Sequence, residues 1–153
     1  MPGLYLHSPA RILSKLLIAL NAGAEPNQTT PSLVTWPIYW DNEPDGSGVP
    51  ANLISVYDTQ GIDKGREMVT NERATYEGLQ VRVRASDKEQ GYAKTQAIAV
   101  LLDQIYQRTV SIGTSSYTIQ SVMRTSMTPQ GREVGQTGRR VWFVNGLITL
   151  RMD

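Results

Sequence analysis

The sequence predicts a single α+β domain, an antiparallel or mixed β-sheet with two main helices packed on one face. Residues 79–85 alternate between apolar and polar side chains without interruption, as a strand with one buried face does. Residues 9–22 and 88–108 carry apolar side chains three and four positions apart, the spacing of an amphipathic helix. The order helix, two strands, polar excursion, strand, helix, three strands is typical of an α+β domain.

Size and composition limit the classes of protein to consider. The chain has 153 residues, enough for one self-sufficient core, so we expect one domain over 1–153. No Cys and a single His exclude disulfides, thiol nucleophiles and Cys/His zinc sites, and we expect no cofactor. A net charge of +1 argues against a dedicated nucleic-acid-binding protein. The apolar run 12–20 is too short to span a membrane, and Lys15, which interrupts it, also disfavours a signal peptide.

The first third of the chain predicts a helix followed by an edge strand. Ser8 is a capping residue and Pro9 suits the first helical position, while Gly23 is a matching stop, so the helix should cover 9–22. Residues 33–40 are typical of a strand, with one face made of Val34, Trp36, Ile38 and Trp40. Pro37 cannot donate to a ladder and places this strand at a sheet edge or at a bulge.

Long polar segments separate the remaining elements. We expect loops at about 41–50, 59–78 and 126–138, with a strand at 53–58 between the first two. A connection as long as 59–78 is usually functional or mobile in a compact domain.

The centre of the chain holds the clearest elements. In strand 79–85, Leu79, Val81, Val83 and Ala85 should face the core, and Gln80, Arg82 and Arg84 should face outward. A capping box from Ser86 to Glu89 begins a helix that extends to about Arg108. Its predicted buried stripe consists of Tyr92, Thr95, Ile98, Ala99, Leu102, Ile105 and Tyr106.

The last third predicts three strands, at 109–112, 117–125 and 139–152. The final strand is apolar on both faces, with Val141, Phe143 and Leu147 on one and Trp142, Val144, Ile148 and Leu150 on the other. One face should meet the helices. The other needs a second cover, for example another subunit.

Charge is distributed unevenly. Residues 41–78 hold eight acidic and three basic residues, a net of −5, whereas residues 104–153 hold six arginines and two acids, a net of +4. Such a pattern suits head-to-tail association of identical subunits. The alternative is that both are solvated loop charges.

The sequence predicts no catalytic residue and no metal site. His7 stands apart from any orienting acid or nucleophile that the sequence could place beside it. The segment from Asp41 to Gly46 imitates the first half of a calcium loop, but Asn52 stands at the twelfth position and Pro44 intrudes. Arg132, Arg139 and Arg140 could contact phosphate or pair with acids, and Trp36 and Trp40 could anchor a partner or fill the core.

Several segments together resemble the tail terminator proteins of tailed bacteriophages, also called minor capsid or tail-completion proteins. They are the N-terminal Leu-rich helix, the strand 79–84, the helix beginning Tyr92-Ala93-Lys94-Thr95-Gln96-Ala97-Ile98, and the closing segment 138–145, Gly-Arg-Arg-Val-Trp-Phe-Val-Asn. The resemblance implies a structural virion protein that is not an enzyme. It implies a homo-oligomeric ring, commonly a hexamer, that caps the head-proximal end of the tail tube and stops its polymerisation.

The resemblance also implies partners and a location. The partners are the major tail tube protein, the head-tail connector or stopper protein, and genomic DNA passing through the lumen without sequence-specific contact; no membrane is involved. The protein would be assembled in the host cytoplasm and remain at the head-tail junction of the virion. The rival interpretations are a head-closure or adaptor ring protein, a nucleic-acid-binding domain, and an acid-base hydrolase using Asp41, Glu43 or Asp45.

On this interpretation the surface residues of interest are those at subunit or tube contacts. We expect them among Trp36, Trp40, Arg82, Arg84, Arg132, Arg139 and Arg140. We also expect loops 59–78 and 126–138 to become ordered on contact with neighbours or the tail tube, because their composition is polar and contains glycine.

Overall fold

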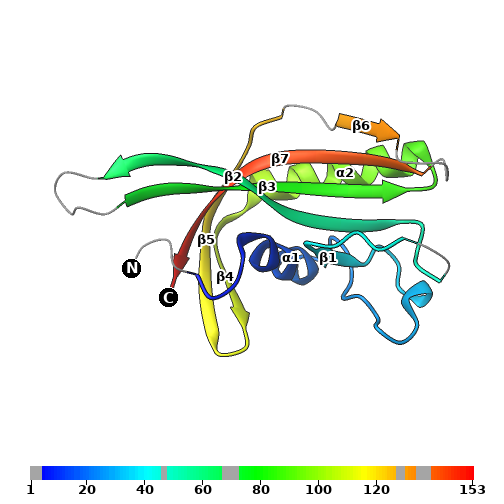
Figure 1. Ribbon diagram of the computed structural model, residues 1–153, viewed down its shortest axis with the longest axis horizontal. Helices are drawn as coiled ribbons and strands as arrows, with labels where there is room; N and C mark the ends of the chain where they lie inside the picture. Colours follow the sequence, from blue (N-terminus) through cyan, green and yellow to red (C-terminus); the bar gives the residue numbers. More distant parts are fainter. Residues whose placement is uncertain (1–4, 46–47, 67–72, 127–129, 134–138) are drawn as a thin grey trace.

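The computed structural model describes residues 5–45, 48–66, 73–126, 130–133 and 139–153. Its elements are, in chain order, α1 (Pro9–Ala19), the 3₁₀ helix η1 (Pro31–Leu33), β1 (Ile38–Trp40), β2 (Leu53–Arg66), β3 (Arg73–Ala85), α2 (Lys88–Gln104), β4 (Tyr106–Ile112), β5 (Ser115–Arg124), β6 (Gln130–Glu133) and β7 (Arg140–Met152). They form the single α+β domain that the sequence predicts (Figure 1).

The strands form one mixed sheet. Its order is β1-β2-β3-β7-β5-β4, and β6 pairs with β7 beside this path. β1 runs parallel to β2, and the other described pairs are antiparallel. β7 lies inside the sheet and is long enough to pair with β3, β5 and β6.

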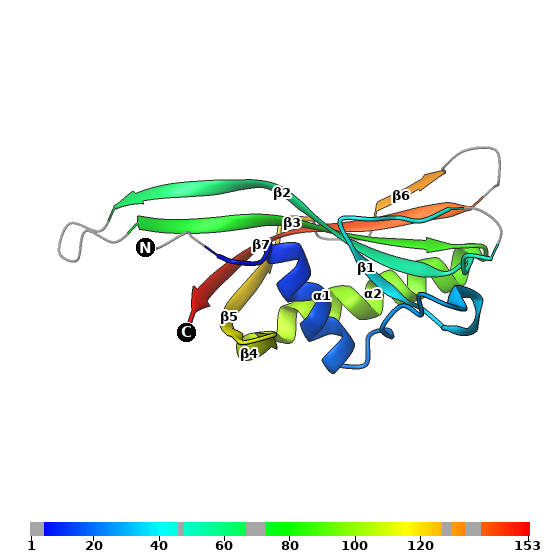
Figure 2. The same ribbon diagram turned by 60° about the horizontal axis from the view of Figure 1, so that its bottom comes forward.

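Both α-helices pack on the same face of the sheet, as predicted (Figure 2). α1 lies against β1, β2 and β4, whereas α2 lies against β3, β5 and β7. Their apolar stripes share one core with the inward side chains of the strands, including Ile12, Leu17, Val81, Ile98, Val144 and Ile148. Burying several such side chains, at about 1.5–3 kcal/mol each, is what holds the two helices to the sheet.

The start of α1 is confirmed and its end is earlier than predicted. Ser8 caps the helix, its Oγ accepting a hydrogen bond from the amide of Arg11 at 3.2 Å. The helix ends at Ala19, short of Ala22, because Asn21 adopts a left-handed backbone with φ of 60°. Gly23 serves a different purpose, since a Cβ there would lie 2.4 Å from the carbonyl oxygen of Trp36.

α2 also begins where predicted and ends early. Its cap is Asp87 rather than Ser86, and the carboxylate accepts hydrogen bonds from the amides of Glu89 and Gln90. The chain becomes extended after Gln104 and enters β4, so the predicted extension to Arg108 is wrong. Of the predicted stripe, Thr95, Ile98, Ala99, Leu102 and Ile105 are buried, but Tyr92 and Tyr106 are 42% and 73% exposed.

The predicted strand 33–40 is wrong over its first half. Residues 31–33 form a 3₁₀ turn and Trp36 has a φ of 52°, which a strand does not accommodate. Only Ile38–Trp40 pair with β2. The position that Pro37 predicts is confirmed, since β1 is the terminal strand of the sheet.

The predicted loop 59–78 is largely β-structure. Residues 59–66 continue β2 and residues 73–78 continue β3, and the two pair antiparallel across register shifts. The pairing of β3 with β7 stops at Glu77 and Ile148, so the β2–β3 pair projects beyond the rest of the sheet as an arm (Figure 1). We call residues 59–66 and 73–77 the arm. The predicted loop 126–138 likewise contains the strand β6.

Candidate interface surfaces

The outer face of the sheet, opposite the helices, carries a cluster of arginines. The alternation of β3 places Arg82 and Arg84 there, with Arg139 beside them at the start of β7. Acidic residues of segments 41–45 and 48–50, which together we call the strap, lie across them. Glu43 is 3.3 Å from Arg82, and Asp45 is 2.9 Å from Arg139 and 3.7 Å from Arg84.

The guanidinium of Arg84 is buried beneath this strap. Its side chain is 4% exposed, and its Nη2 donates to the carbonyl oxygen of Pro50 at 3.2 Å. Nε has no hydrogen-bond partner among the residues that the structure describes. Burial lowers the pKa of Arg84, and the nearby charge of Arg139 lowers the pKa further. The carboxylate of Asp45 is therefore the main compensation for a charge that the fold has removed from water.

These ion pairs explain part of the uneven charge distribution. Glu43 and Asp45 belong to the acidic middle of the sequence, and Arg139 belongs to its basic end, yet they meet within one chain. On the same outer face, Leu53 and Val141 flank Arg84 in register and are fully buried.

The two tryptophans among the predicted interface residues, Trp36 and Trp40, lie elsewhere, against the helices. The Nζ of Lys94, on α2, is 5.4 Å from the ring centre of Trp36, and partial burial lowers the pKa of this lysine. Trp40 is 44% exposed, with the guanidinium of Arg11 on α1 5.3 Å from its ring centre. The structure thus separates the predicted interface residues into an outer arginine group and a helix-side tryptophan group.

The remaining two candidates lie on the β6–β7 ladder. Arg132 pairs in register with Val141, and its side chain is outside the described atoms. Arg140 stands in β7 between Ala85 and Glu133. The role of all seven predicted residues in subunit or tube contacts stays a prediction.

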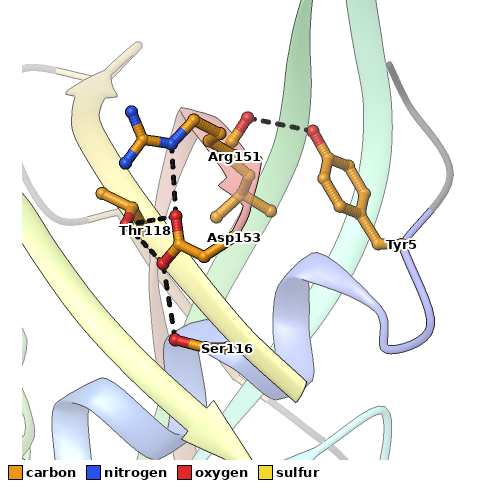
Figure 3. Close-up of polar contacts among 6 residues, drawn as sticks. Tyr5, Ser116, Thr118, Arg151 and Asp153 are labelled. Atoms are coloured by element: carbon orange, nitrogen blue, oxygen red, sulfur yellow. Dashed lines mark hydrogen bonds and ion pairs between the residues drawn. The ribbon is translucent and has the colours of Figure 1, made fainter. Parts of the chain in front are cut away.

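Polar contacts hold Tyr5 and Asp153 against β5 and β7 (Figure 3). Tyr5 donates its hydroxyl to the carbonyl oxygen of Leu150 at 3.1 Å. The carboxylate of Asp153 accepts hydrogen bonds from Thr118 at 2.9 Å, from Arg151 at 3.2 Å and from Ser116 at 3.4 Å. The hydroxyl of Thr118 contributes most to a lowered pKa of Asp153.

His7 takes part in the same region. Its Nδ1 is 2.6 Å from the hydroxyl of Tyr117, a fully buried residue of β5, and the two rings pack edge to face. This contact fixes the N-terminal segment on the sheet.

The sequence predicted two exposed stretches of strand only in part. Every residue from Asp58 to Ile62 in β2 is exposed, and so is every residue from Tyr106 to Thr109 in β4, whereas the predicted strands ended at Asp58 and began at Thr109. The sequence of the arm looks like a polar loop because glycines interrupt it. Thr75 and Tyr76, which favour strands and shortly precede strand 79–85, could have indicated that the strand begins earlier. β4 was obscured because its first residues continue the periodicity of α2.

The described residues offer little to a metal ion. They hold no group of three or more metal-binding side chains, and Glu43 and Asp45 of the calcium-like segment face arginines instead. Within the same residues, no helix has the length and apolar character needed to cross a membrane.

Comparison with known proteins gives one family. The family model described as "Bacteriophage tail terminator protein" matches residues 20–137, most of the chain. No curated protein matches. One solved structure is similar over 91% of this chain and 89% of its own, at 15% identity and a TM-score of 0.41, too low to support an argument. On the strength of the family match, the chain belongs to the bacteriophage tail terminator proteins.

Proposed function

We propose that this protein forms a ring, a hexamer, that caps the head-proximal end of the phage tail tube and stops its polymerisation. The family match over residues 20–137 is the observation that carries the proposal, because it assigns the chain a structural role in the tail. In this role the protein catalyses no reaction.

The proposed partners follow from the position of such a ring. One face meets the major tail tube protein and the other meets the head-tail connector or stopper protein. Genomic DNA passes through the lumen without sequence-specific contact, and a net charge of +1 is compatible with passage rather than tight binding. Assembly takes place in the host cytoplasm, and the ring remains in the virion.

The fold supports a ring in one respect. A closed ring needs heterologous contacts, in which two different surfaces of the same chain meet. The sheet has a projecting arm near one end of its strand order and, at the other, the strand β4, one edge of which has no partner among the described residues. Two such unlike surfaces are what head-to-tail closure requires.

The decisive experiment measures mass and tube binding together. Light scattering gives the mass of the purified protein alone and after mixing with tail tube protein, and negative-stain microscopy locates it on the tubes. We expect closed rings at tube ends and shorter tubes. A protein that stays monomeric and ignores tubes contradicts the proposal, and binding to the portal in place of the tube would favour an adaptor protein.

A further inference from the structure

The sheet leaves two strand edges without a partner among the described residues. β1 pairs with β2 only from Ile54 to Val56, so the same side of β2 is unpaired from Tyr57 onward. At the opposite end of the strand order, β4 pairs with β5 alone. The other terminal strands are shorter, with three residues in β1 and four in β6.

Part of each unpaired edge is also exposed on its faces. Five consecutive residues, 58–62, are exposed in β2, so neither face of the arm at that point lies against the core. They include Ile62, which is 49% exposed. In β4 the exposed run 106–109 includes Tyr106 at 73%. A two-stranded ribbon is at best marginally stable in water, and unpaired amides and carbonyls favour pairing with another strand.

We propose that the free edge of β2 in the arm pairs with the free edge of β4 in a second copy of the chain. The sheets of neighbouring copies thereby join into one continuous sheet. This inference rests on the proposed ring and names the contact that closes it. A second copy is the partner because the two edges belong to opposite ends of one sheet, and joining them head to tail leaves neither edge unpaired.

Charge does not carry this pairing. The β2 part of the arm, residues 59–66, holds one acid, Asp63, and two bases, Lys64 and Arg66, and β4 holds Arg108 and no acid. The pairing depends on the unpaired backbone amides and carbonyls of the two edges. Gln107, with a φ of 49°, interrupts β4, so the regular part of its edge is Arg108–Ile112, where the residues pair in unbroken register with Ser115–Ile119.

Cysteine cross-linking tests the contact directly, because the chain contains no native Cys. Gln60→Cys and Ile62→Cys are made on the arm, and Thr109→Cys and Ser111→Cys on β4, each in a separate protein. An arm variant is then mixed with a β4 variant and oxidised, so that a mixed cross-link can form only between copies. Val100→Cys is the matched control, since Val100 on α2 is 46% exposed and belongs to neither edge.

We expect at least one arm and β4 combination to shift from the monomer to the dimer mass on a non-reducing gel, while Val100→Cys does not. Neighbouring strands bring cysteines within the 4.4–6.8 Å between Cα atoms that a disulfide needs. As a check without substitutions, amide hydrogen exchange at Thr59–Ile62 and Arg108–Val110 should slow on assembly, and exchange at Leu53–Val56 should not change.

Failure of this contact is distinguishable from failure of the ring. If light scattering finds the ring but neither cross-linking nor slower exchange occurs at the two edges, the inference is overturned and the proposed function stands. If the unmodified protein remains a monomer even in the presence of tail tubes, both are overturned.

Discussion

At the scale of single residues, Arg84 is the most unusual feature of the molecule. The alternation in strand 79–85 correctly places its side chain outside the helix-packed core, but the strap then buries it. A buried charge is costly unless it is paired, and removing its partner is more damaging than removing both. Stability at this site should therefore depend on Asp45, even though Asp45 is itself mostly exposed.

We expect Asp45→Asn to lower the free energy of unfolding by about 1–2 kcal/mol, because buried Arg84 would then face Arg139 without a carboxylate between them. Urea denaturation of the two proteins measures the difference.

Glu25→Gln provides a matched control. Glu25 has the same 62% side-chain exposure as Asp45, but its partner Lys15 is 38% exposed, where Arg84 is 4% exposed. We expect a change below about 0.5 kcal/mol for this surface pair. Equal effects of the two substitutions would show that burial of Arg84 is not what gives Asp45 its importance.

The second prediction at this scale concerns pH. The pKa of Asp153 is lowered from its ordinary value of 3.8, chiefly by the hydroxyl of Thr118. A carboxyl with a lowered pKa in the folded state stabilises the fold above 3.8, and the contribution is lost as the pH falls through the lowered value.

Thr118→Val should therefore raise the pKa of Asp153 toward 3.8 and weaken the dependence of stability on pH in acid. Titration of the carboxyl carbon by NMR measures the pKa. Thr125→Val, a substitution of an exposed threonine directly after β5, should leave it unchanged, and a similar rise in both variants would refute the assigned cause.

At the scale of elements, the docking of α2 on the sheet depends on a close approach at Gly91. A Cβ there would lie 2.8 Å from both Cδ1 and Nε1 of Trp142 in β7, and 3.0 Å from the Cβ of Ala85. Nε1 of Trp142 is buried and has no hydrogen-bond partner within the described part of the chain, so this ring contributes packing rather than polar contacts there. Helix propensity and packing thus make opposite demands on position 91.

We expect Gly91→Ala to lower the free energy of unfolding by about 1–3 kcal/mol, although alanine favours a helix interior by about 1 kcal/mol over glycine. In a Trp142→Leu background the same substitution should be much less costly or stabilising, with a coupling of at least about 1 kcal/mol. A double-mutant cycle by thermal or urea denaturation tests this. Additive effects would mean that the ring does not set the distance between α2 and β7.

At the scale of the whole molecule, the question is what drives association. The uneven charge distribution suggests electrostatic head-to-tail contacts, but several of those charges are already paired within the chain. Contacts between strand edges depend mainly on backbone hydrogen bonds and apolar area, which salt affects little.

We therefore expect the assembled mass to persist when salt is raised from about 0.1 M to about 1 M, a change that shortens the Debye length from about 10 Å to about 3 Å. Light scattering across a salt series measures this. The Val100→Cys protein, which we expect not to form cross-linked dimers, is kept under reducing conditions as a control for handling. Dissociation in proportion to salt would instead favour association through the acidic and basic segments.

The local pattern of the sequence determined most of what lies in the core. The cap at Ser8, the inward stripe of α1, the strand 79–85 and the two-faced final strand depend on hydrophobic periodicity and capping, which act over a few neighbouring residues. The α+β class follows from their order. The Leu-rich helix and the segments around 79–98 and 138–145 were also sufficient to indicate the tail terminator family.

Tertiary structure alone decided where polar segments lie. The arm has no buried face to impose an alternation on its residues, so its strands exist through pairing with each other and leave little trace in the sequence. The burial of Arg84 likewise depends on a strap about forty residues away in the chain. Hydrophobic periodicity indicates which residues contact a core. The arm and the burial of Arg84 instead depend on contacts between distant segments outside the core.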